Sequence, residues 1–149
     1  MKRINTQSPA KINLYLRVLG KRHDGYHDIA TSFQLIDLFD EMSFEVTKNG
    51  ISVNSSQDFL NGEDNTIYKA AKRFKELFNI KTGIKININK NIPIGAGLGG
   101  GSSNAASTMV ALNRLWDINL DTENLIDIAK DVGADVPLFI FGKNSIGRG

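Results

Sequence analysis

The stretch PIGAGLGGGSSN, residues 93–104, holds the most informative pattern in this chain of 149 residues. Five of the seven positions from 95 to 101 are glycine, so few side chains cover the backbone N–H groups there. We call residues 93–101 the glycine loop. A predicted helix follows it, and free N–H groups at a helix N-terminus attract anions, as does the helix dipole. The pattern predicts a phosphate site. The alternative is a flexible linker, but linkers rarely separate a strand from a helix.

Two well-known phosphate loops fit this stretch poorly. Gly95, Gly97 and Gly100 match the G-x-G-x-x-G pattern of dinucleotide-binding folds. That loop follows an unbroken apolar strand and precedes an acidic residue at the end of a second strand. Residues 84–89, IKININ, instead alternate between apolar and polar, and the candidate acids lie between two predicted helices. The P-loop is excluded because no Lys-Ser or Lys-Thr pair closes the glycine run.

Hydrophobic periodicity predicts the remaining elements. Alternation in the first strand places Lys11 and Asn13 on its polar face, opposite Ile12. An Asn-Gly turn at residues 49–50 predicts a hairpin between its flanking strands. Pro137 predicts that no helix continues there and that a buried strand follows. We expect strands over residues 10–18, 29–35, 42–46, 51–53, 84–88 and 138–141, and helices over about 65–78, about 102–116 and from 121 to Gly133. This order predicts an α+β fold in two layers, with a mixed, mainly antiparallel sheet against helices.

Composition excludes several classes of protein. The 18 Lys and Arg residues against 16 Asp and Glu give a formal net charge of +2, too small to predict a nucleic-acid or membrane surface. The chain has no cysteine, so it has neither disulfides nor thiolate metal sites. No apolar stretch reaches the length of a membrane span, and no signal-peptide core follows the first residues. These features are compatible with a reducing cytoplasm, where we expect the protein.

Four motifs in this sequence resemble those of the GHMP kinases. They are the glycine loop with SSNAA after it, PAKINL at residues 9–14, DGYH at 24–27 and GADVP at 133–137, in the family's order. The resemblance implies an ATP-dependent kinase that phosphorylates a hydroxyl of a small molecule. It also implies that residues 1–149 form the N-terminal, ATP-binding domain of a longer enzyme, without the family's C-terminal domain. The chain's last residues, SIGRG, read as the start of another strand.

The resemblance assigns roles to individual residues, each of which also has a simpler structural interpretation. It implies that Lys11 and Asp135 are catalytic, whereas by spacing alone Lys11 is a surface lysine and Asp135 a turn residue. Asn65 matches a residue that contacts adenine in the family, but it also suits a helix N-cap. The resemblance places ATP on the loop residues Pro93, Ile94, Gly95, Ala96, Gly97, Leu98, Gly99, Gly100, Gly101, Ser102 and Ser103.

Substrate recognition is the second set of roles that the resemblance implies. The Tyr26-His27 pair, together with the GGGSSNAA form, is typical of members in non-mevalonate isoprenoid biosynthesis, whose substrate carries a cytidine diphosphate group. There Tyr26 stacks on the cytosine, His27 hydrogen-bonds it, and Asn13 binds the acceptor polyol. The structural alternative is that these three are surface or packing residues.

The metal is the least defined component. Transfer from ATP normally uses Mg²⁺, for which Ser102 or Ser103 offers one ligand, but no dedicated second carboxylate is evident. With only two histidines, a transition-metal site is not expected. Two other functions stay open: another GHMP kinase, acting on homoserine or mevalonate, and a non-catalytic nucleotide-binding module. The oligomeric state is open as well.

Overall fold

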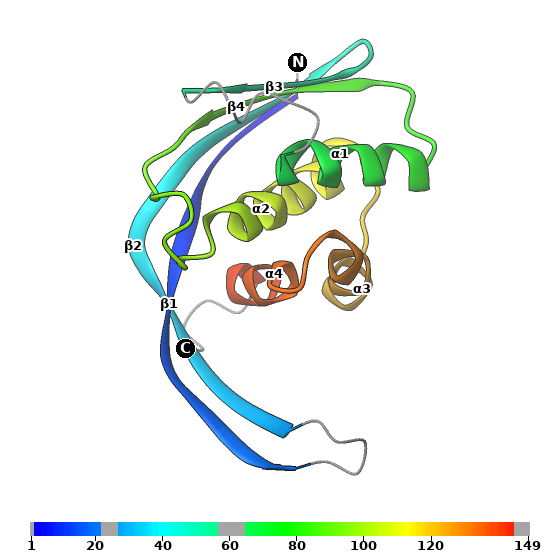
Figure 1. Ribbon diagram of the computed structural model, residues 1–149. Coiled ribbons are helices and arrows are strands. Elements are labelled where there is room, and N and C mark those ends of the chain that lie inside the picture. Colours follow the sequence, from blue (N-terminus) through cyan, green and yellow to red (C-terminus); the bar gives the residue numbers. More distant parts are fainter. Residues whose placement is uncertain (1, 22–26, 57–64, 145–149) are drawn as a thin grey trace.

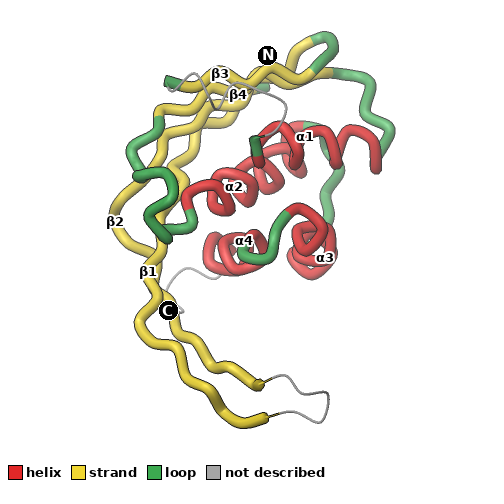
Figure 2. The backbone as a smooth tube through the Cα atoms, in the orientation of Figure 1, coloured by secondary structure: helices red, strands yellow, loops and turns green. Residues whose placement is uncertain are grey.

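The computed structural model describes residues 2–21, 27–56 and 65–144. Within them a four-stranded sheet curves around a layer of helices (Figure 1). The far ends of the two longest strands run past the helices as a two-stranded arm (Figure 2). The strands are β1 (Arg3–Lys21), β2 (His27–Thr47), β3 (Ile51–Ser55) and β4 (Gly83–Asn89). The helices are α1 (Thr66–Leu77), α2 (Gly100–Leu115), α3 (Thr122–Val132) and α4 (Val136–Asn144). The expected two-layer α+β class is confirmed.

The prediction of a hairpin at the Asn-Gly turn is wrong, because β2 and β3 are not neighbours in the sheet. The strand order is β1-β2-β4-β3, so β4 lies between β2 and β3 and pairs antiparallel with β2 and parallel with β3. Ile84, Ile86 and Ile88 of β4 are almost fully buried and need a central strand, whereas β3 is short and suits an edge. The turn still serves the sheet, because Gly50 O accepts a hydrogen bond of 2.9 Å from Ile84 N.

Two of the expected strands are one. Residues 29–35 and 42–46 both belong to β2, and β1 begins seven residues earlier than expected. The pairing of β1 with β2 shifts register at three places, between Pro9 and Ala10, Asn13 and Tyr15, and Val18 and Gly20, and β2 continues through all of them as one strand. Such a bulge bends a strand without ending it. Residues 36–41, which separate the two expected strands, therefore continue β2.

Helices α1, α2 and α3 confirm the periodicity-based predictions. Asn65 caps α1 by accepting a hydrogen bond from Tyr68 N at 2.7 Å, and Asp121 caps α3 by accepting one from Asn124 N at 2.8 Å. Their apolar faces and the isoleucines of β4 form one core. Its largest fully buried side chains include Phe44, Phe74, Phe139, Ile84, Ile86, Met109 and Leu112.

The last expected strand is a helix, which corrects the prediction for residues 138–141. Pro137 is the second residue of α4, where its missing N–H costs nothing because first-turn N–H groups have no intrahelical acceptor. Val136, Phe139 and Ile140 are buried, and their spacing of three and four residues is that of one helix face. A helix that is apolar on several sides had been interpreted as a buried strand. None of the helices in the described part of the chain has the length and apolarity to cross a membrane.

Candidate functional site

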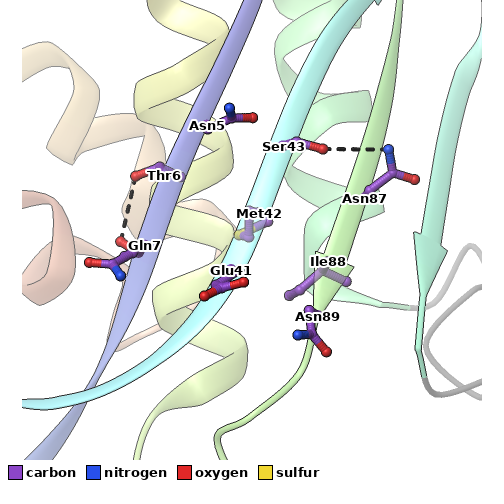
Figure 3. A pocket seen from close by; sticks show the side chains of 9 residues that line it. All are labelled: Asn5, Thr6, Gln7, Glu41, Met42, Ser43, Asn87, Ile88 and Asn89. Carbon is purple, nitrogen blue, oxygen red and sulfur yellow. Dashed lines mark hydrogen bonds between the residues drawn. The ribbon is translucent and has the colours of Figure 1, made fainter.

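Two hollows in the surface are candidate sites, and they lie on different sides of the sheet. The larger, of about 800 Å³, lies on the face that points away from the helices and is lined by β1, β2 and β4 (Figure 3). Polar side chains such as Gln7, Glu41 and Asn89 cover it, and a hydrogen bond of 3.4 Å joins Asn87 Nδ2 to Ser43 Oγ. None of the residues predicted for catalysis or binding lines it. We therefore assign no chemistry to it, despite its size.

The second hollow, of about 420 Å³, lies at the glycine loop and the N-terminus of α2. Gly99 is the N-cap of α2 with φ 71°, and no side chain caps this helix, unlike α1 and α3. The first turn closes with a hydrogen bond of 2.9 Å from Ser103 N to Gly99 O. The N–H groups of the residues before Ser103 therefore have no acceptor within the helix. Gly95 and Gly97 also have positive φ, with nothing within 4 Å of a Cβ at either position. The geometry is that of an open anion cradle.

Lys11 lies against this cradle, on the opposite face of β1 from the one expected. Its side chain is directed toward the helix layer and it is only 7% exposed, whereas Ile12 on the other face is 37% exposed. Its N–H donates to Leu98 O at 2.9 Å, which attaches the glycine loop to β1. Among the residues that the structure describes, the Lys11 ammonium has no ion-pair or hydrogen-bond partner. Lys11 is not among the residues that line the hollow, but its Cγ would lie 3.1 Å from a Cβ at Gly99. A buried cation without a counter-ion favours an anionic ligand.

Asp135 is exposed and lies immediately before α4. One turn further, Phe139 packs into the corner between the loop and β1. A Cβ at Gly99 would lie 2.7 Å from Phe139 Cζ and 3.1 Å from Lys11 Cγ. Asp135 therefore lies in the turn that leads into the helix carrying Phe139 to this corner. Asp135 is not among the residues that line the hollow, and its catalytic role stays a prediction.

The start of α1 forms one wall of the hollow. Asn65 caps α1, which confirms the N-cap interpretation, and it also lines the hollow, while its contact with adenine stays a prediction. Thr66 Oγ1 donates to Gly101 O at 2.9 Å, which holds α1 against the glycine loop. None of the sequence motifs predicts this contact of Thr66. The exposed apolar loop residue Ile94, 49% exposed, lines the same hollow.

The residues expected to bind the substrate are only partly described. Asn13 follows Lys11 by two residues on β1 and is exposed. Tyr26 lies outside the described residues. His27 is the first residue of β2, but its side chain also lies outside the described part.

The two serines proposed as metal ligands differ in position. Ser102 lines the hollow and is partly exposed. Ser103 is fully buried, and its Oγ is 2.8 Å from Ser8 Oγ, so its hydroxyl faces the interior. In the part of the chain that the structure describes, no three His, Cys, Asp or Glu side chains cluster to hold a metal ion.

A buried ion pair beneath the loop was missed by the sequence analysis. Lys90 Nζ lies 2.5 Å from Asp40 Oδ2, with side chains 3% and 0% exposed. Asn104 of α2 joins both, and Ser8 joins Asn104. We call Ser8, Asp40, Lys90, Ser103 and Asn104 the buried polar network. Lys90 and Asn104 also line the hollow.

The signal for this network was present in the alternation of two strands. Phe44 and Met42 point inward on β2, and the next inward position is Asp40. On β4 the inward isoleucines end at Ile88, and the next inward position is Lys90. Because Met42 pairs with Ile88, the next inward residues of the two strands stand opposite each other. Opposite charges at adjacent inward positions predict a buried pair.

Comparison with known proteins agrees with this geometry. The chain matches the family described as GHMP kinases N terminal domain over residues 65–143. A Prochlorococcus marinus (strain AS9601) protein named 4-diphosphocytidyl-2-C-methyl-D-erythritol kinase is 50% identical over 143 residues, covering 95% of this chain and 46% of that protein. A Methylococcus capsulatus protein of the same name is 47% identical, covering 95% and 49%. The chain spans about half the length of the curated relatives it matches.

Solved structures give the same result at the level of the fold. A crystal structure of 4-(cytidine 5'-diphospho)-2C-methyl-D-erythritol kinase superposes with a TM-score of 0.81 and 38% identity, covering 93% of this chain and 49% of that chain. Methanococcus jannaschii mevalonate kinase superposes with a TM-score of 0.69 and 19% identity, covering 94% and 51%, which shows a common fold. Sequence and structure agree on one assignment: the chain belongs to the GHMP kinase N-terminal domain family.

Proposed function

We propose that this chain is the nucleotide-binding part of an ATP-dependent kinase acting on 4-diphosphocytidyl-2-C-methyl-D-erythritol, giving the 2-phosphate in non-mevalonate isoprenoid biosynthesis. The relatives at 47–50% identity carry that kinase's name. The observation that carries the proposal is the buried Lys11 side chain, whose Cγ would lie 3.1 Å from a Cβ at Gly99, the N-cap of α2 that no side chain caps. Both features favour a polyanion such as a triphosphate.

In this proposal the glycine loop and α2 hold the triphosphate. The substrate hydroxyl gives its proton to the Asp135 carboxylate, its oxygen attacks the γ-phosphorus, and ADP leaves. Lys11 stabilises the negative charge that develops on the transferred group. Positioning and electrostatics account for most of the catalysis of phosphoryl transfer, so this small set of residues suffices.

Mg²⁺ fits this site through the nucleotide. Mg²⁺ is commonly held by one or two protein ligands, with phosphate oxygens and water completing the shell. Ser102, partly exposed at the N-terminus of α2, is the hydroxyl placed to be such a ligand. Ser103 is excluded by its buried contact with Ser8. The ion would neutralise charge on the β- and γ-phosphates.

Recognition of the substrate is proposed for Asn13, Tyr26 and His27. Asn13 is exposed two residues beyond Lys11 on the same strand face, which suits a hydrogen bond to the acceptor polyol. Tyr26 and His27 would bind the cytosine. We place ATP's adenine near Asn65 and the remaining substrate contacts on a second domain, which corresponds to the other half of the relatives. We propose a cytoplasmic location, where ATP is supplied.

The test is an ADP-release assay with ATP and three acceptors on the protein that also carries the proposed second domain, alongside calorimetric titration of residues 1–149 with ATP. Release of ADP with 4-diphosphocytidyl-2-C-methyl-D-erythritol alone supports the proposal. Release with homoserine or mevalonate instead assigns another kinase of the family. ATP binding without turnover on any acceptor identifies a nucleotide-binding module. Absence of ATP binding contradicts the assignment of the phosphate site itself.

A further inference from the structure

The Asp40 carboxylate holds both ends of the glycine loop. Its Oδ1 accepts hydrogen bonds from Asn91 N at 2.6 Å and Ile92 N at 2.8 Å, the two residues before the loop. Its Oδ2 accepts one from Asn104 Nδ2 at 3.0 Å, three residues after the loop. A single fully buried group therefore fixes the entry and the exit of the loop to β2.

The partner of this carboxylate lies directly beneath the anion cradle. Lys90 Nζ donates to Asp40 Oδ2 at 2.5 Å and to Asn104 Oδ1 at 3.1 Å. A Cβ at Gly100, the first residue of α2, would lie 3.1 Å from that same Nζ. The Asp40–Lys90 pair carries no net charge, but its ammonium lies next to the first residue of α2, and Asp40 determines the position of that ammonium.

The network also reaches the strand that carries Lys11. Asn104 Nδ2 lies 3.1 Å from Ser8 Oγ, and Ser8 Oγ lies 2.8 Å from Ser103 Oγ. Ser8 is three residues before Lys11 on β1. Lys11 N in turn donates to Leu98 O, so the loop is attached to β1 at its centre and to β2 at its ends.

We propose that Asp40 is a positioning residue for nucleotide binding. It touches no ligand, but it holds the glycine loop open and keeps the Lys90 ammonium under the N-terminus of α2. The inference rests on the proposed function, because it assumes that the loop binds ATP. If Asp40 had a purely structural role, its replacement would change stability alone. If Asp40 positions the loop, its replacement weakens ATP binding even when a second substitution restores stability.

The experiment compares Asp40→Asn, Lys90→Met and the double variant by thermal unfolding and by calorimetry with MgATP. Each single variant leaves one buried charge unpaired and lowers the melting temperature, whereas the double variant removes both charges and regains much of it. We expect the double variant to bind ATP roughly tenfold or more weakly than wild type, as for loss of a charge-assisted hydrogen bond. If the double variant regained wild-type ATP affinity as well as stability, the proposal would be overturned.

A readout without nucleotide separates this inference from the proposed function. Amide hydrogen exchange follows the N–H of Lys11, which is remote from Asp40 and bonded to the loop at Leu98. We expect faster exchange at Lys11 in the double variant, with unchanged exchange in α3. Unchanged exchange at Lys11 overturns the inference even if the wild type binds no ATP. The matched control is Lys72→Met with Glu76→Gln, which removes an exposed ion pair on α1 and should alter neither readout.

Discussion

At the scale of single residues, Lys11 combines burial with an unpartnered charge. Lys11→Met keeps the length of the side chain and removes the cation. We expect the free energy of unfolding to stay the same or rise by about 1 kcal/mol, because function and not stability favours the charge. ATP affinity should fall. Urea unfolding and calorimetry measure the two effects, with the exposed Lys69→Met as control. A large loss of stability would mean that the ammonium has a structural partner.

Asp135 is the second residue with a testable role. Asp135→Asn keeps the shape of the side chain but cannot accept the hydroxyl proton. In the protein that also carries the proposed second domain, we expect turnover to fall by about 10²–10⁴, with little change in ATP affinity. Asp127→Asn, at an exposed position of α3, is the matched control. Combining Asp135→Asn with Lys11→Met should cost less than the product of the two effects, since both act on the same transfer. Near-normal turnover would leave Asp135 as a turn residue.

At the scale of elements, the junction of the glycine loop and α2 does not tolerate a side chain at Gly99. Gly99 has φ 71°, and a Cβ there would contact Phe139 and Lys11. Gly99→Ala should therefore displace α4 or Lys11, lower stability by about 1–3 kcal/mol and weaken ATP binding. Thermal unfolding and calorimetry report both effects.

The matched change lies two residues further along the same loop. At Gly101 a Cβ would be no closer than 3.6 Å to Thr66, and φ is not positive. Gly101→Ala should keep or raise stability, because alanine favours a helix over glycine by about 1 kcal/mol. Equal destabilisation by Gly99→Ala and Gly101→Ala would contradict the geometry at Gly99.

The elements also show how far sequence reasoning reaches. Periodicity was sufficient for α1, α2, α3 and β4, because their apolar residues repeat without interruption. It failed at α4, where Pro137 was taken to exclude a helix that begins one residue before it. It also failed to place β3, because pairing partners depend on a strand that arrives later in the chain. At the site, the motif located the glycine loop, but no motif includes Asp40 or Lys90, whose burial together depends on the pairing of β2 with β4.

At the scale of the whole molecule, the sheet depends on the close passage of β4 beside the turn that follows β2. A Cβ at Gly83 would overlap the backbone of Asn49 and Gly50. Gly83→Ala should separate β4 from this turn and lower the free energy of unfolding by about 1–3 kcal/mol or more. The loss should appear as a lower midpoint of one cooperative transition in urea, compared with Gly101→Ala. An unchanged midpoint would show that the turn moves aside freely.

The central place of β4 has a consequence for biosynthesis. A ribosome releases β2 and β3 first, joined by an Asn-Gly turn that favours local pairing between them. The native neighbour of both strands emerges only later, after α1. A nascent chain must therefore keep β2 and β3 from pairing, or separate them again, before β4 inserts between them. The folding rate of this domain then depends on pairing between strands that are distant in the sequence and not on the Asn-Gly turn. We therefore expect folding to be slow.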